Sequence, residues 1–170
     1  MADGSFLLWP DKRLRAPADP VGAVDDAALR TWDKMLELMY DMPGVGLAAP
    51  QIGVMRRLAV VDCADAMGEA RAPIRLADPE VVEASEERFE YEEASPNLPG
   101  VSARVSRPAA VKVGFLDMAG QRTERWFEGL WATSVQHQID HLDGKVFVDR
   151  LSRTKRRMAL DRYAKLRRKG

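Results

Sequence analysis

The sequence is poor in residues that crosslink a chain and has no segment suited to a membrane. Cys63 is the one cysteine among 170 residues, so an internal disulfide is excluded and a reducing compartment is indicated. It follows the apolar run 58–61 closely, which favours a small buried side chain over a metal ligand. The longest apolar runs fall far short of a membrane span, and residues 6–9 are too few for a signal-peptide core. We therefore expect a cytoplasmic protein that does not enter a membrane.

Histidine is almost as scarce, and both copies lie in one short stretch. His137 and His141 are four residues apart, which places them on one face of a helix about one turn apart. The same spacing occurs in the H-E-x-x-H metal helix, where the intervening Glu is the general base. Here Gln138 occupies that position, and a neutral amide cannot take a proton from water near neutral pH. Two histidines can also be ordinary polar groups near a core, but their restriction to this motif favours a site.

The formal net charge is zero, but the charges are unevenly distributed. Residues 150–170 hold ten Lys and Arg side chains against Asp161 alone, a net charge of +9, so the preceding residues carry −9. A polyanionic partner is one expectation for such a basic segment. A solvated helix that pairs with the acidic body is the other.

The remaining pattern predicts a single α+β domain over residues 1–170. One helix should begin after Asp25 or Asp26 and end near residue 40, a second should run from Gly129 to a stop at Gly144, and a basic third should span about 152–166. Short connections favour antiparallel pairing of five strand-like segments, at about 57–62, 74–77, 81–91, 109–117 and 123–128. The Gly- and Ala-rich loop 42–53 leaves its backbone nearly bare, so another group can approach it closely.

Two long motifs resemble those of the peptide deformylase family. Residues 44–51 read GVGLAAPQ and match the first family motif throughout. Residues 128–130 read EGL and residues 136–144 read QHQIDHLDG, matching the third motif except at Gln138. The resemblance implies a deformylase-like fold in which antiparallel strands pack around a helix carrying HxxxH, followed by a C-terminal helix.

The resemblance also implies a metallohydrolase that removes the formyl group from N-terminal formyl-methionine. Its metal, Fe(II) or zinc, would lie between His137, His141 and a cysteine of the second motif. Gln138 stands in place of the catalytic Glu, and Gln51 corresponds to a side chain that stabilises the oxyanion. The substrate-binding positions map to Val45, Gly46, Leu130, Thr133 and Ser134.

The second motif departs from the family pattern of Glu-Gly-Cys-Leu-Ser followed by Pro-Gly. Residues 93–100 read EASPNLPG, so Ser95 stands in place of the metal-binding cysteine. A serine hydroxyl is not among the usual zinc ligands. Pro96 has no backbone N–H, and the family's backbone oxyanion donor is therefore absent. Loss of one such donor typically lowers the rate by roughly 10²–10³, and loss of a general base by roughly 10²–10⁴.

Three functions are compatible with these departures. The first is a deformylase-like protein with little or no activity that binds formylated or unformylated peptide N-termini, as a monomer, with weakly held zinc or Fe(II) or no metal. The second is an active hydrolase in which Glu92, Glu93 or water replaces the cysteine, or in which Ser95 is a nucleophile beside a histidine. The third is an interaction domain that keeps the histidines only for packing.

Overall fold

The structure is a computed structural model that describes residues 6–170. Its α-helices are α1 (Asp26–Asp41), α2 (Gly129–Leu142) and α3 (Arg153–Lys169). Short 3-10 helices are η1 (Lys12–Arg15), η2 (Ala49–Ile52), η3 (Asp65–Met67) and η4 (Phe147–Arg150). The strands are β1 (Gly46–Ala48), β2 (Leu58–Val61), β3 (Ile74–Ala84), β4 (Arg88–Ala94), β5 (Ser102–Pro108), β6 (Ala110–Leu116) and β7 (Arg122–Glu128). None of the helices between residues 6 and 170 is both long and apolar enough to cross a membrane.

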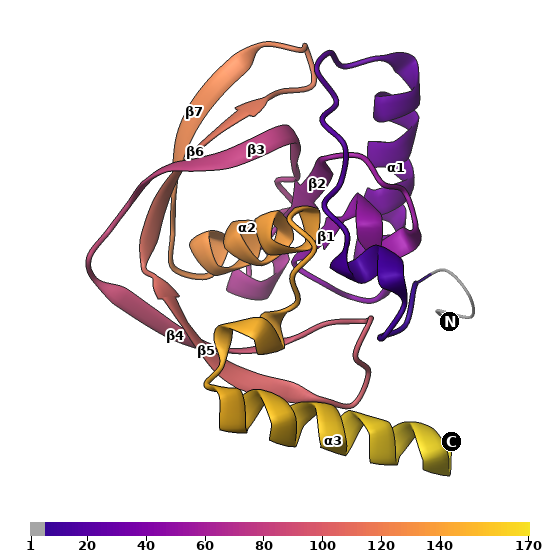
Figure 1. Cartoon of the computed structure of the whole chain (residues 1–170). Coiled ribbons are helices and arrows are strands. Elements are labelled where there is room, and N and C mark those ends of the chain that lie inside the picture. The colour runs from indigo at the N-terminus through magenta and orange to yellow at the C-terminus, as the bar shows by residue number, and fades with distance from the viewer. Residues whose placement is uncertain (1–5) are drawn as a thin grey trace.

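The strands form two antiparallel sheets around α2. A five-stranded sheet has the order β1-β2-β3-β6-β7, and β4 pairs with β5 in a separate ribbon. Figure 1 shows α2 in the middle of the molecule, with α1 on the far side of β1 and β2 and with α3 beneath the β4–β5 ribbon. The predicted α+β class, with antiparallel strands around the helix that carries the histidines, is confirmed.

The two sides of the large sheet are packed by different helices, and β2 shows why. Its four residues are all buried. Successive side chains of a strand point to opposite faces, so Leu58 and Val60 pack with α1 while Ala59 and Val61 pack with α2. A strand covered on both faces is apolar at every position. This packing fixes α2 against β1, and hence against the glycine-rich loop before it.

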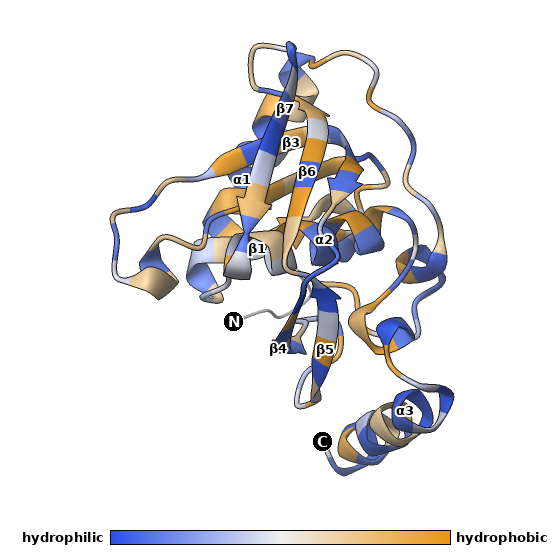
Figure 2. Cartoon of the chain, turned by 90° about the vertical axis from the view of Figure 1, so that its left-hand side faces the viewer, coloured by the Kyte–Doolittle hydropathy of each residue, from blue (hydrophilic) through white to orange (hydrophobic). Residues whose placement is uncertain are grey.

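A third apolar cluster holds α3 in place. Tyr163 of α3, 3% exposed, packs with side chains from η4, β5 and the loop after β4, namely Leu98, Val101, Val105, Val146, Phe147 and Val148. The Tyr163 hydroxyl donates to the Trp9 backbone oxygen over 3.2 Å. The solvent side of α3 is largely polar, which is visible as the blue segments of this helix in Figure 2.

The helix predictions hold, and the strand predictions need correction. Asp25 caps α1 by accepting the Ala28 N–H, α2 begins at Gly129 as predicted, and α3 runs three residues beyond the predicted end. The segments predicted at 74–77 and 81–91 are wrong in their boundaries, because β3 continues through Pro79 with irregular register and the chain breaks at 85–87 instead. Asp78 allows this by adopting a positive φ of 48° and by accepting the N–H groups of residues 21 and 22.

β5 was missed altogether by the sequence prediction. Its alternating burial does not show in the sequence, because the two buried positions are Val105 and the charged Arg107, with Ser106 between them. All seven of its residues nevertheless pair with β4. The predicted loop 42–53 likewise contains β1 and η2.

Candidate active site

α2 carries both histidines into the interior and places their rings side by side. The two Nε2 atoms are 3.1 Å apart, and the ring centroids are 4.9 Å apart. The Nδ1 atom of His137 lies 2.8 Å from the Glu93 carboxylate, which requires Nδ1 to be the donor and leaves the Nε2 lone pair facing His141 when the ring is neutral. Burial lowers the pKa of His141 well below its usual value, so that ring is neutral. Its buried Nδ1 atom has no hydrogen-bond partner among residues 6–170.

A series of buried ion pairs holds Glu93, the carboxylate that contacts His137. Glu93 accepts two hydrogen bonds from Arg107, of 2.7 and 2.9 Å, and Arg107 donates a third to Asp140 over 2.9 Å. Asp140 is held in turn by Arg150. Burial alone would raise the pKa of Glu93, but the hydrogen bonds and charges of Arg107 and His137 outweigh it and lower that pKa. Glu93 is therefore a carboxylate already engaged on both oxygens.

The position of the family cysteine is part of a closed hydrogen-bond network. The Ser95 hydroxyl donates to Asn97 Oδ1 over 3.0 Å, and its oxygen accepts the Asn97 backbone N–H over 3.3 Å. The side-chain amide of Gln51 donates to the same Asn97 oxygen over 2.7 Å and lies 3.4 Å from the Ser95 oxygen. The Gln51 oxygen accepts the Ala48 N–H over 2.8 Å. The polar atoms of Ser95 and Gln51 are thus occupied by neighbouring residues.

Asn97 was not expected to be a site residue, and no local pattern indicates its role. It is fully buried, with its side-chain nitrogen donating to the backbone oxygens of Leu7 and Gln51. Its backbone oxygen accepts the N–H of Trp9 over 2.9 Å. Asn97 therefore connects three segments by hydrogen bonds: residues 7–9, the loop after β4, and η2, which contains Gln51.

The donor set does not fit a catalytic metal site with three protein ligands. The 3.1 Å between the two histidine nitrogens is close to the roughly 3.4 Å that two ligands span on a tetrahedral zinc ion. A third ligand is lacking: among residues 6–170, no group of three or more His, Cys, Asp or Glu side chains is arranged to hold a metal ion. Ser95 lies at the position that the resemblance assigns to that ligand, but its hydroxyl proton is directed at Asn97.

A cleft of about 540 Å³ opens beside His137. It brings together nearly all the residues predicted for the site, namely Val45, Gly46, Gln51, Ser95, Leu130, Thr133, Ser134, His137 and Gln138. His141 is not among the lining residues and lies beneath His137. The bare backbone of Gly46 makes room for α2: a Cβ there would lie 2.4 Å from Gln138 Nε2 and 2.5 Å from Ser134 Oγ. The Ser134 hydroxyl closes this contact by donating to the Val45 oxygen over 2.9 Å.

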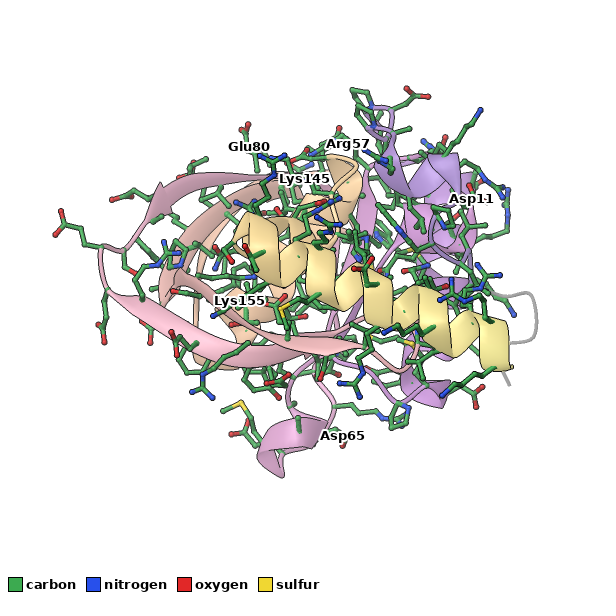
Figure 3. The ribbon with its side chains drawn as sticks, turned by 60° about the horizontal axis from the view of Figure 1, so that its bottom comes forward. Asp11, Arg57, Asp65, Glu80, Lys145 and Lys155 are labelled. Carbon is green, nitrogen blue, oxygen red and sulfur yellow. The ribbon has the colours of Figure 1, made fainter. Side chains whose placement is uncertain are left out.

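The opposite face of α2 borders a second hollow of about 690 Å³. Arg107 and Asp140 lie at its wall together with the more exposed Arg57, Glu80 and Arg150. Arg57 and Glu80 are labelled on the same side of the molecule in Figure 3. The buried ion pairs therefore separate two hollows, and of the two histidines only His137 lines one of them, the first.

Comparison with known proteins identifies the family. The polypeptide deformylase family model matches residues 5–157. The chain belongs to this family. It is 47% identical over 162 residues to a peptide deformylase of Methylocella silvestris, covering 94% of this chain and 83% of the relative. It is 45% identical to one of Rhizobium meliloti, covering 94% and 91%.

Solved deformylase structures share the fold at similar coverage. A peptide deformylase from Legionella pneumophila superposes with a TM-score of 0.86 at 42% identity, covering 96% of this chain and 94% of that one. One from Ehrlichia chaffeensis in complex with actinonin gives 0.87 at 33% identity, covering 95% of each. The deformylase resemblance read from the motifs is confirmed.

Two chemical alternatives for this deformylase-family site find no geometric support among the described residues. The hydrogen bonds of Ser95 go to Asn97 and Gln51 and not to a histidine, so the arrangement needed for a Ser–His nucleophile is absent there. Glu93 is committed to Arg107 and His137. Glu92, which lines the cleft, is the remaining candidate for a substitute carboxylate ligand.

Proposed function

We propose that this member of the deformylase family binds peptide N-termini in the cleft beside His137 and has little or no deformylase activity. The observation that carries the proposal is the network of Gln51, Ser95 and Asn97. It engages the one oxyanion donor that the resemblance leaves in place. Residual binding of zinc or Fe(II) by His137 and His141 would be weak, and metal-free protein would keep the cleft.

The expected loss of rate is large because the changes affect different parts of the reaction. Pro96 and the engaged Gln51 amide remove oxyanion donors, each typically contributing roughly 10²–10³ to the rate. Gln138 removes a general base that contributes roughly 10²–10⁴. These factors need not multiply, but any one of them makes a poor deformylase.

The decisive experiment combines metal analysis with turnover of a formyl-methionyl peptide. The purified protein should contain less than one metal ion per chain and release no measurable formate. The combined substitutions Ser95→Cys and Gln138→Glu, with Pro96→Leu added, should restore metal binding and some activity. Robust turnover by the unmodified protein with added iron or nickel would instead support an active hydrolase with an altered ligand set, such as Glu92.

A second part of the proposal concerns a polyanionic partner for α3, such as ribosomal RNA. Residues 150–170 carry a net charge of +9, and most of the basic side chains of α3 are exposed. Co-sedimentation with ribosomes should disappear when residues 152–170 are deleted. Equal binding by the truncated and full-length proteins would refute this contact.

A further inference from the structure

We propose that the cleft selects peptides with a free N-terminal ammonium over N-formylated peptides. This inference rests on the proposed function, because it presumes that peptide N-termini enter the cleft. It goes further by naming the chemical form of the ligand and the residues that choose it.

The first argument is the shortage of donors for a formyl oxygen. The Gln51 amide nitrogen donates to Asn97 Oδ1 over 2.7 Å and lies 3.4 Å from the Ser95 oxygen. The Ser95 hydroxyl donates to Asn97, and Pro96 has no N–H to offer. A carbonyl oxygen buried without a hydrogen bond loses its interaction with water and gains nothing in return. A formyl group placed against these residues would therefore bind poorly.

The second argument is the sign of the charges around the cleft. Asp41, Glu92 and Glu93 line it, and no Lys or Arg is among the described lining residues. Glu93 is compensated by Arg107, whereas Asp41 and Glu92 form no ion pair within residues 6–170. Both of these carboxylates are exposed at the rim. Their negative charges attract an ammonium group, whereas a neutral formyl group gains no such attraction.

The rest of the cleft wall indicates an apolar first side chain. The lining includes Met42, Pro43, Val45, Leu130 and Pro99. Burying an apolar side chain such as that of methionine against this surface is favourable, whereas burying a charged side chain there is not. The ligand class is therefore a peptide with a free amino terminus followed by an apolar residue.

The test is a calorimetric titration of the full-length protein with methionyl-alanyl-serine and with its N-formyl form. We expect the free peptide to bind roughly tenfold more tightly or better. Equal affinities, or tighter binding of the formylated peptide, would overturn the preference while leaving peptide binding intact. Failure of both peptides to bind, or release of formate, would contradict the proposed function itself.

Variants connect the preference to its residues. Glu92→Gln should weaken binding of the free peptide several-fold and leave the formylated peptide unaffected. Glu90→Gln is the matched control, because Glu90 lies on the same strand but pairs with Arg104 outside the cleft. Asn97→Ser should improve binding of the formylated peptide by releasing the Gln51 amide. The melting temperature of this variant should also be measured, because the Asn97 side chain donates to the Leu7 backbone oxygen as well. Unchanged discrimination in both Glu92→Gln and Asn97→Ser would overturn the assignment.

Discussion

Asn97 shows how one side chain can change the chemistry of an inherited site. Its oxygen accepts hydrogen bonds from both Gln51 and Ser95, although Gln51 is 46 residues away in the sequence. The motifs alone identified Gln51 as an available oxyanion donor. In the structure the Gln51 amide donates to Asn97 Oδ1, and we expect this hydrogen bond to compete with one to a substrate oxygen.

Cys63 gives a prediction at the same scale. It is fully buried after β2, and burial raises the pKa of its thiol to about 12. A raised pKa favours the neutral thiol, whereas the thiolate is the reactive form. At pH 8 we expect no labelling by a disulfide reagent such as DTNB in the native protein and complete labelling in urea. Labelling of the folded protein within seconds would show that Cys63 is accessible, contrary to its packing.

At the scale of elements, the β4–β5 ribbon and α2 are joined through buried charge. Arg107 of β5 is 3% exposed and links Glu93 of β4 to Asp140 of α2. Removing one member of such a group leaves its partners charged and unpaired in a poorly solvated interior. The ribbon should therefore depend on Arg107 far more than on its surface ion pairs.

Arg107→Gln is predicted to lower the free energy of unfolding by about 3–5 kcal/mol. Arg104→Gln is the matched control, since Arg104 also lies on β5 and pairs with a β4 glutamate, Glu90, but both side chains are more than half exposed. That pair should contribute at most about 1 kcal/mol. Urea unfolding of the two variants measures the difference. Equal losses would mean that Arg107 is not the link between ribbon and helix.

At the scale of the whole molecule, charge is divided between the body and the last helix. Figure 3 shows α3 across the front, with Lys155 near its first turn, while Asp11, Asp65 and Glu80 project from other elements. The acidic body bears the cleft, and the basic segment after residue 149 carries +9. Under the proposed function, the cleft would attract a cationic peptide terminus and α3 would attract a polyanion at a separate surface.

The polyanion contact should depend steeply on salt. Replacing the exposed Lys155, Arg157, Arg162 and Lys165 by Gln should weaken binding to a ribosomal RNA fragment and reduce the slope of log K against log salt, by about 0.9 per lost phosphate contact on duplex segments. Fluorescence anisotropy at several salt concentrations provides the measurement. A slope that does not change would place the RNA contact elsewhere or exclude it.

The sequence by itself determined the family, the α+β class and the helix that carries His137 and His141. These follow from contiguous motifs and from the 3.6-residue period, which are local properties of the chain. The single domain over residues 1–170, the monomeric state and the cytoplasmic location stay predictions.

Only the tertiary structure decided what the site offers a ligand. β5, the ion pairs through Arg107 and the contact of Asn97 with Gln51 all join segments that are distant in sequence. Such pairings depend on which strands and loops meet in the folded chain, and no short window of residues records them. The helix with the two histidines could be read from the sequence, whereas the closed network beside it depends on long-range packing.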